Sequence, residues 1–457
     1  MTRQQVVITG AGAVSAFGTG LPALFDGLRA GRSAVAPIRW FDAGAFPATV
    51  GAEVLTDIDD GGISHAWLQR ALRQLLPAGG MAESPVLAAT LAAYAAKGAW
   101  RDRKTVFGLL AALEAWQMAG CANASPATAS ATADPGMATA SPTPQIGLVL
   151  ALGLEQGFLQ DFGPVFDGQH IDWQAPPARS GIVFRSEVDL CAQLLADLLP
   201  LCGPNLVNVS ACAAGGLALA QAASLIERGA VDRVLCGGAD SMLNPLGLGG
   251  MSRLGAPSPR NTSDACRPFD AHRDGLVIGE GAAMFVLESS ASAKARGVPV
   301  LARVLGYGST QDAYRVTAPR PDGASAQRAM QQALRHAGLA AARVGYINAH
   351  GTGTPLNDVA ESRAIEALFG ASRPPVSSIK GALGHVMAAS GALEAAACLL
   401  PLLHNILPGN AHLQQADPQC GVNLIGTQPV TAKVDVVLSN SFGFGGQNVA
   451  LLLGRAE

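Results

Sequence analysis

Cys212 stands at a change of pattern within the stretch 205–216, which reads NLVNVSACAAGG. The apolar residues before it predict a strand, and the small residues after it predict a helix. We therefore expect the thiol at a strand-to-helix elbow, where the helix dipole and free N–H groups favour the nucleophilic thiolate. The alternative is that Cys212 is one of eight cysteines that serve as small buried apolar residues.

Two histidines are set among glycines in a way that the other histidines of the chain are not. His350 ends an apolar run in the stretch 344–355, VGYINAHGTGTP, and His385 follows Gly384, five residues after Lys380. Each histidine alone could be a satisfied polar residue in a turn. The shared setting makes both of them candidates for a site.

A cysteine with two histidines favours acyl transfer. The thiolate can take an acyl group as a thioester, while two imidazoles hydrogen-bond the carbonyl of a second thioester and stabilise its enolate. Metal binding is the competing use of these residue types. It fits less well, because each ligand would stand alone on its own loop without paired spacing. We predict no metal site.

A glycine-rich turn follows the last apolar run, in the stretch 438–448, LSNSFGFGGQN. Such turns expose backbone N–H groups, so this one can form half of an oxyanion hole, with the N–H of Cys212 as the other half. One donor of that kind is worth roughly 3–4 kcal/mol. A simple hairpin is the alternative.

The elements that must position these residues alternate along the chain. Short apolar runs typical of strands buried on both faces alternate with helical patterns, which predicts a layered α/β fold. The expected strands are 6–9, 146–150, 206–209, 233–235, 283–287, 344–347 and 434–438, and the expected helices are 104–118, 213–228, 324–337, 358–369 and 391–403.

Composition excludes several classes of protein. Only 14% of the residues are charged and 49% are apolar, which excludes global disorder, and the net charge of −3 gives no basic field for nucleic acid. No uninterrupted apolar stretch reaches the ~18 residues of a membrane helix, and the first apolar run breaks at Gly10, before a signal-peptide core could form. The cysteines form no CxxC pair, so we expect a reducing, cytoplasmic location.

Two segments are assigned no chemical role. Residues 121–144, rich in Ala, Ser, Thr and Pro, predict a flexible surface insertion, with an interdomain linker as the alternative. Gly10-Ala11-Gly12 invites a dinucleotide-binding interpretation, but Ser15 stands where the third glycine belongs. A tight turn is the better prediction there.

Together these motifs resemble the β-ketoacyl-acyl carrier protein synthases, the condensing enzymes of type II fatty acid and polyketide synthesis. The resemblance covers nearly the whole chain, and its motifs come in the family's order: VVITGAGAVSAFG at 6–18, Ser210-Ala211-Cys212, RPFD at 267–270, Gly279-Glu280-Gly281, NAHGTGTP at 348–355, Lys380 with Gly384-His385, and NSFGFGG at 440–446. It implies a thiolase-like five-layer αβαβα sandwich of two similar βαβαβαββ halves, residues 1–298 with the nucleophile and 299–457 with the histidines.

The resemblance also implies roles for residues. Cys212 would be the acyl-accepting nucleophile, while His350 and His385 would assist decarboxylation of malonyl-carrier protein. Lys380 would orient the second histidine site, paired with Glu394. Further matched residues are Phe442 as gate and oxyanion-hole N–H, Thr352 and Thr354 as phosphopantetheine contacts, and Asn348, Glu361 and Glu394 as a polar cluster that holds a monovalent cation in some relatives.

The chain departs from the family's pattern in the turn after 146–150. Leu154 and Glu155 stand where relatives have a small Gly-Ser/Thr-Gly turn that floors the acyl pocket at the dimer interface. The charge of Glu155 argues against an ordinary long saturated substrate and raises the prospect of a non-identical partner chain. Arg315 stands where many relatives have histidine, near the substrate entrance.

The implied partner is an acidic acyl carrier protein, and no cofactor is expected beyond its phosphopantetheine. We expect a homodimer or a heterodimer, and a basic docking patch at Arg70 and Arg73 or at 101–104. The main alternative is a chain-length-factor-like subunit, but such subunits lack the active cysteine. A thiolase would need a second cysteine in the glycine-rich turn, which has none, and a reductase would need the incomplete Gly10–Gly12 motif.

Overall fold

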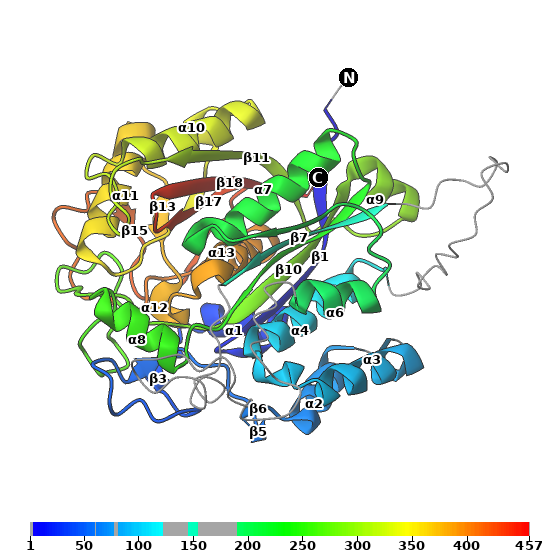
Figure 1. The fold of residues 1–457 in the computed structure, drawn as a ribbon. Helices are drawn as coiled ribbons and strands as arrows, with labels where there is room; N and C mark the ends of the chain where they lie inside the picture. Colours follow the sequence, from blue (N-terminus) through cyan, green and yellow to red (C-terminus); the bar gives the residue numbers. More distant parts are fainter. Residues whose placement is uncertain (1–2, 60, 77–80, 122–144, 154–189, 457) are drawn as a thin grey trace.

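A computed structural model describes residues 3–59, 61–76, 81–121, 145–153 and 190–456 (Figure 1). Twelve described strands form one sheet, with β2 (Gly18–Thr19) paired to β1 off the main path. In spatial order the other strands are β15 (Asn423–Leu424), β13 (Pro375–Ser377), β12 (Tyr346–Asn348), β17 (Val436–Gly443), β18 (Gln447–Arg455), β11 (Ala302–Gln311), β1 (Val6–Ser15), β10 (Gly281–Ser289), β9 (Arg233–Asp240), β7 (Ile146–Leu152) and β8 (Asn205–Asn208). Three ribbons complete the described strands: β3 (Ala36–Pro37) with β4 (Val50–Gly51), β5 (Ile58–Asp59) with β6 (Gly62–Ile63), and β14 (Ile406–Leu407) with β16 (Val430–Thr431).

The two ends of this sheet repeat one pattern of strand directions. From β1 outward, β1, β10 and β9 pair antiparallel, and β9, β7 and β8 pair parallel. From β11 outward, β11, β18 and β17 pair antiparallel, and β17, β12 and β13 pair parallel. The strands β1 and β11 join the two sets, with Ile8 opposite Ala302.

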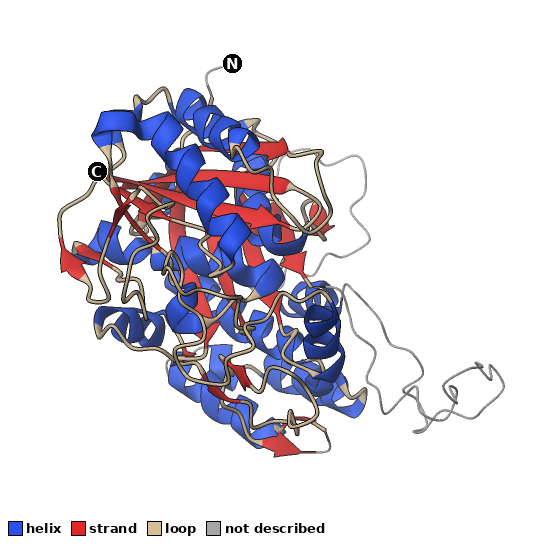
Figure 2. Cartoon of the chain, turned by 90° about the vertical axis from the view of Figure 1, so that its left-hand side faces the viewer, coloured by secondary structure: helices blue, strands red, loops and turns tan. Residues whose placement is uncertain are grey.

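Helices cover both faces of each set of strands and make the fold layered (Figures 1 and 2). From the top of Figure 1 the layers are α10 and α11, the β11 set, α7 and α13, the β1 set, and α4 with α6. The central helices bury the largest apolar cluster between the two sets, and outer clusters lie under α4 and α10. The arrangement is the expected five-layer αβαβα sandwich.

The described helices have the following bounds. They are α1 (Leu21–Arg29), α2 (His65–Leu75), α3 (Pro85–Ala96), α4 (Arg103–Met118), α6 (Leu190–Leu198), α7 (Ala214–Glu227), α8 (Pro245–Arg253), α9 (Ser290–Arg296), α10 (Ala324–Ala337), α11 (Pro355–Phe369), α12 (Lys380–Leu383), α13 (Ser390–Ala397) and α14 (Leu399–His404). The helix expected over 391–403 is thus two helices, α13 and α14. The expected insertion 121–144 lies outside the described residues except for Cys121.

The expected turn at Gly10–Gly12 is wrong, because β1 continues through it to Ser15. A Cβ at Gly10 or Gly12 would lie 2.0 or 2.1 Å from a backbone oxygen of α4, so these glycines let the helix approach the strand. In β11, Gly306 and Gly308 face α10 in the same way, at 2.4 and 2.1 Å. The glycines therefore mark matching helix contacts in the two halves of the sheet.

One apolar helical stretch among the described residues, Met387–His404, is long enough to cross a membrane by length and composition. Its residues are 89% buried inside the protein, where α13 packs against α7. In the sequence, Glu394 and Pro401 interrupt this apolar stretch. In the structure both residues lie within its helices, Glu394 in α13 and Pro401 in α14.

Candidate active site

Cys212 lies at the expected elbow. It sits in a 3-10 turn, Ala211–Ala213, between β8 and the first residue of α7, and the preceding Ala211 has a positive φ of 46°. A left-handed alanine costs about 1–3 kcal/mol and persists where the surrounding packing demands it. Burial raises the pKa of the Cys212 thiol to about 12, against the opposing effects of the Lys380 charge and the Phe444 backbone N–H. Burial therefore outweighs the lowering of the thiol pKa that was expected from the helix end.

The helix that begins at the elbow crosses α13 at glycines. A Cβ at Gly215 would lie 2.5 Å from the backbone nitrogen of Ala392, and one at Gly391 would lie 2.4 Å from that of Gly216. The two backbones are thus in contact one turn behind Cys212. Because interiors pack at crystal-like density, this contact fixes the position of the elbow relative to α13.

His350 follows β12 and is held through its backbone. The Glu361 carboxylate, on α11, accepts hydrogen bonds from the backbone N–H groups of His350 and Gly351 at 2.9 and 2.8 Å. The Nδ1 atom of the His350 ring lies 3.1 Å from Nζ of Lys380. A lysine ammonium only donates, so Nδ1 accepts and Nε2 carries the ring proton.

Lys380 uses all three of its donors inside the protein. Its Nζ donates to the His350 carbonyl at 2.5 Å, to the His350 ring and to the carboxylate of Glu394, with which it forms a buried ion pair. The resemblance implied that Lys380 orients the site of His385. The hydrogen bonds instead connect Lys380 to His350, and the pairing with Glu394 is as expected.

His385 is fixed by the segment that follows it. The backbone N–H of Met387 donates to Nδ1 at 3.1 Å, and Ser390 Oγ lies 2.9 Å from the same atom. The Met387 backbone has a positive φ of 41°, which turns its N–H back toward the ring. Nδ1 is thereby occupied as an acceptor, and Nε2 remains as the free donor.

The two rings lie together, with centroids 5.3 Å apart and planes at 84°. Burial lowers the pKa of both histidines well below 6.5, and the nearby Lys380 charge lowers each pKa further. Both imidazoles are therefore neutral at pH 7. Two neutral Nε2–H donors are well suited to stabilising a developing oxyanion.

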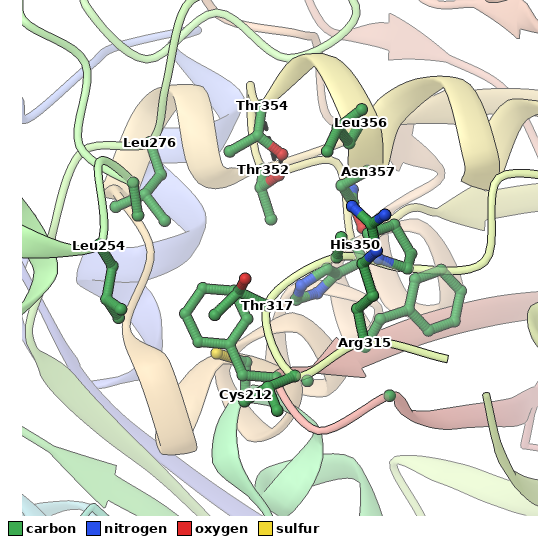
Figure 3. A pocket seen from close by; sticks show the side chains of 18 of the residues that line it. Cys212, Leu254, Leu276, Arg315, Thr317, His350, Thr352, Thr354, Leu356 and Asn357 are labelled. Atoms are coloured by element: carbon green, nitrogen blue, oxygen red, sulfur yellow. Dashed lines mark hydrogen bonds between the residues drawn. The ribbon is translucent and has the colours of Figure 1, made fainter. Parts of the chain in front are cut away.

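Cys212, His350 and His385 line one pocket of about 420 Å³ (Figure 3). Thr352 and Thr354 also line it, with their hydroxyls 2.8 Å apart. Figure 3 shows the pair on the wall above the cysteine. The structure thus brings together the residues that the sequence singled out separately.

Phe442 and Phe444 both line the pocket, in different ways. The Phe442 ring lies 5.6 Å from the His350 ring and is 7% exposed. Phe444 follows the end of β17, and its backbone N–H lowers the pKa of the Cys212 thiol against the larger effect of burial. Sequence reasoning missed Phe444, although the same NSFGFGG motif contains it. It also missed Ser390, the first residue of α13, whose contact with His385 depends on where that helix begins.

The expected polar cluster is present and contains unpartnered atoms. Within the described residues, neither side-chain polar atom of Asn348 has a hydrogen-bond partner, and the same holds for Asn440 Oδ1. Asn348 pairs with Ser439 across β12 and β17, and Asn440 donates to Glu361 at 3.0 Å. Among the described residues, no three His, Cys, Asp or Glu side chains group as metal ligands, so a cation here would rely on amide and hydroxyl oxygens.

Other predicted positions fall elsewhere. Leu154 and Glu155, the expected floor of the acyl pocket, lie outside the described residues. The expected basic patch at 101–104 is wrong, since Arg101, Arg103 and Lys104 are 7, 3 and 6% exposed. Arg103 is buried in an ion pair with Glu280. Clustered charges in the sequence here mark a buried network rather than a solvated face.

Comparison with known proteins gives the family. The Beta-ketoacyl synthase N-terminal domain model matches residues 97–293, and the C-terminal domain model matches residues 301–414. The 3-oxoacyl-[acyl-carrier-protein] synthase 2 of Synechocystis is 35% identical over 99% of this chain and 98% of its own length. That of Coxiella burnetii is 33% identical over 100% of this chain and 99% of its own length. The chain belongs to the β-ketoacyl synthase family.

Solved ketosynthase structures share the fold. A type II polyketide synthase acyl-carrier protein in complex with its ketosynthase matches with a TM-score of 0.80 at 25% identity, covering 100% of both chains. The ishigamide ketosynthase/chain length factor matches with a TM-score of 0.76 at 31% identity, again over 100% of both. As a member of this family the chain is an acyltransferase of the ketosynthase type, which condenses acyl thioesters in type II fatty acid or polyketide synthesis.

Proposed function

We propose that this chain condenses an acyl thioester with malonyl-acyl carrier protein, with Cys212, His350 and His385 as its catalytic residues. The observation that carries the proposal is the shared pocket, in which a thiol at a helix start faces two neutral histidines. Each ring has Nδ1 occupied and Nε2 free. This is the donor arrangement that decarboxylative condensation requires.

The first step loads the enzyme. Cys212 Sγ attacks the carbonyl of an acyl-carrier thioester, the thiol of the carrier leaves, and the acyl group stays on Sγ as a thioester. Because burial holds the thiol protonated, Sγ must lose its proton as it attacks, and the departing carrier sulfur takes up a proton and leaves as the thiol. The Lys380 charge and the Phe444 N–H favour the thiolate at that point.

The second step makes the carbon nucleophile. Malonyl-carrier binds with its thioester carbonyl toward Nε2 of His350 and His385. Loss of CO2 leaves the electron pair on the enolate, and the two N–H donors stabilise its oxygen. The enolate carbon then attacks the Cys212 thioester, and collapse releases Sγ and the β-ketoacyl-carrier product.

The third step needs an oxyanion hole at the acyl-enzyme. We assign it to the backbone N–H groups of Cys212 and Phe444, in place of Phe442, because Gly443 lies against the backbone of Cys212, Phe444 lines the same pocket, and its N–H lowers the pKa of the thiol. Phe442 contributes its ring, which packs against His350. Losing one such donor typically costs about 2.7–4 kcal/mol in the transition state.

The remaining matched residues support this machinery. Thr352 and Thr354 would hold the pantetheine arm with their paired hydroxyls, and Lys380 would hold the Nε2–H form of His350. Asn440 donates to Glu361 at 3.0 Å, and Glu361 in turn holds the backbone of His350. Apart from the phosphopantetheine of the carrier, we propose no cofactor.

We propose that two chains assemble along β8. It is the edge strand of the sheet, with Leu206 40% exposed, and the adjacent Val209 is 46% exposed. An unpaired edge with apolar side chains is a template for pairing with another strand. The second chain is identical or a related ketosynthase-like chain, and the repeated strand pattern supports halves that divide near residue 298. We place the protein in the cytoplasm, where its cysteines would stay reduced.

Acylation of Cys212 tests the proposal directly. We expect acyl-carrier protein to add its acyl mass to the Cys212 peptide in intact and peptide mass spectrometry. Cys212→Ala should abolish condensation and retain some decarboxylation of malonyl-carrier, because both histidines remain. A chain-length-factor-like role would instead give no adduct with any carrier-bound acyl group, and this outcome would overturn the enzymatic proposal.

A further inference from the structure

Cys121 follows the end of α4, and two arginines converge on its sulfur atom. Nη1 of Arg233 donates to Sγ of Cys121 at 3.7 Å, and Nη1 of Arg296 donates to it at 3.5 Å. The cysteine is buried, at 2% exposed, and it does not line the pocket that holds Cys212. We call Cys121, Arg233 and Arg296 the thiol cluster.

Three separate parts of the chain form the thiol cluster. Arg233 is the first residue of β9, and Arg296 is the last residue of α9. The backbone N–H of Cys121 donates to the carbonyl of Trp116 at 3.1 Å, which ties the cysteine to the last turn of α4. The fold therefore fixes the sulfur between the two guanidinium groups.

The thiol cluster has more positive than negative charge around it. The buried carboxylate of Glu288 pairs with Arg296 at 3.3 Å and also accepts two hydroxyl hydrogen bonds. Arg233 is 8% exposed, and within the described residues it forms no ion pair and its Nε has no hydrogen-bond partner. Arginine keeps its proton in proteins, and a buried charge without a partner is costly. The site can therefore accommodate one more negative charge beside Arg233.

We propose that Cys121 is a modification site, at which a peroxide oxidises the thiol and the two arginines hold the anionic product. The sulfur attacks one oxygen of hydrogen peroxide, and the S–O bond forms as the O–O bond breaks. The second oxygen leaves as water with the thiol proton, so the sulfur is oxidised by two electrons and the peroxide is reduced. A second peroxide converts the sulfenic acid to the sulfinic acid in the same way, and this acid is ionised at neutral pH.

The arginines favour both the reaction and its product. Cationic donors beside a sulfur atom stabilise the negative charge that the sulfur carries as it attacks, and hydrogen bonds from a cation to an anion are stronger than neutral ones. An oxygen added to Sγ would give the Arg233 guanidinium an acceptor for its unpartnered Nε. The proposal does not depend on the condensation reaction, because the thiol cluster and the catalytic pocket share no residue.

Two other buried thiols provide internal controls. Cys191 and Cys236 are 1% and 0% exposed, so a peroxide reaches them no more easily than it reaches Cys121. No arginine of the described residues donates a hydrogen bond to either sulfur atom. Burial raises the pKa of both thiols, that of Cys191 to about 12. A difference in oxidation rate would thus report the two arginines and not exposure.

Oxidation of the wild-type chain is the first test. The full-length protein is treated with hydrogen peroxide at neutral pH, sulfenic acid is trapped with dimedone, and sulfenic and sulfinic acid are quantified for each cysteine peptide by mass spectrometry. We expect Cys121 to be oxidised at least about tenfold faster than Cys191 and Cys236. Equal rates for the three thiols would overturn the proposal. Because each peptide is measured separately, oxidation of Cys212 does not enter the comparison.

Arg233→Gln tests the contribution of the guanidinium. Arg233 has no ion pair to lose within the described residues, so thermal unfolding of the variant should match wild type. We expect oxidation of Cys121 to slow at least about fivefold, while the rate at Cys191 stays the same. The matched control is Arg228→Gln, at an exposed arginine after α7. An unaltered rate in Arg233→Gln would overturn the proposal, as would equal slowing in the control, and if Arg233→Gln did not fold the wild-type comparison would decide.

Discussion

Lys380 links the two kinds of support that the site needs, charge compensation and control of a tautomer. Its ammonium pairs with Glu394 in the interior and holds Nδ1 of His350 as an acceptor. We expect Lys380→Met to lose condensation by about 10²–10³-fold, the effect of losing one oxyanion donor, because the His350 proton is then free to move to Nδ1. The variant should also lose about 3–5 kcal/mol of stability, since Glu394 is left buried and unpaired.

The double variant Lys380→Met/Glu394→Leu separates these effects. Replacing a buried ion pair by apolar residues of similar volume is often neutral for stability, so denaturant unfolding should return toward wild type. Decarboxylation of malonyl-carrier should stay as low as in Lys380→Met. Recovery of turnover together with stability would show that Lys380 acts only through the ion pair.

The buried histidines make a prediction about pH. In the folded protein the pKa of His350 and of His385 lies well below 6.5, whereas unfolded histidine titrates near ~6.5. Below that pH the histidines are protonated in the unfolded chain and stay neutral in the folded protein, so the free energy of unfolding falls. Each histidine should contribute up to about 1.4 kcal/mol per pH unit. Urea unfolding between pH 7.5 and 5.5 should show a shallower fall for His385→Gln, and an identical slope would contradict burial of a neutral ring.

At the scale of single residues, the sequence predicted the catalytic side chains and missed the backbone groups that act beside them. Cys212, His350 and His385 are recognisable because their residue types and glycine neighbours are unusual. The position of the Phe444 N–H depends on where the chain turns after β17. The contact of Lys380 with His350 depends on how β12 meets α12, whereas the pairing of Lys380 with Glu394 was predicted. Those are tertiary relations, and the residue types alone do not encode them.

At the scale of elements, the crossing of α7 and α13 positions the nucleophile. Gly215→Ala would place a methyl group 2.5 Å from the backbone of Ala392, so the helices must separate. We expect a loss of about 1–3 kcal/mol in thermal or urea unfolding, and slower acylation of Cys212. The matched control is Gly250→Ala on α8, where no atom of the described residues lies within 4 Å and alanine should stabilise the helix by about 0.5–1 kcal/mol. Equal effects of the two substitutions would contradict the crossing.

Most strands and helices followed from hydrophobic runs, and α10 has the expected bounds. The predictions failed where a glycine is needed so that a helix can pack closely, and not so that the backbone can turn. Gly10 and Gly12 suggested a turn, yet they lie in β1 because α4 packs directly on their backbone. A local pattern does not distinguish a glycine that bends the chain from one that makes room for a helix.

At the scale of the whole molecule, the repeated order of strand directions explains why one chain carries a thiol and two histidines at one place. Cys212 follows β8, in the first set of strands, whereas His350 follows β12 and His385 follows β13 and α12, in the second. The helices α7 and α13 meet between the sets, so the loops that carry these residues converge there. Before the structure, only the family resemblance implied this duplication; in the structure, glycines of β1 and β11 make matching helix contacts.

The exposed edge of β8 leads to a prediction about assembly. Leu206 and Val209 would be buried if a strand of a second chain added to this edge, since strand addition continues the backbone hydrogen bonds of the sheet. We expect light scattering after size exclusion to give the mass of two chains for the protein alone or with a ketosynthase-like partner. Leu206→Lys/Val209→Lys should give single chains in both cases, because charges on an edge strand oppose pairing. Leu55→Lys, at a side chain that is 58% exposed and is not part of β8, should leave the assembly intact. A two-chain mass for the double lysine variant would place the interface elsewhere on the molecule.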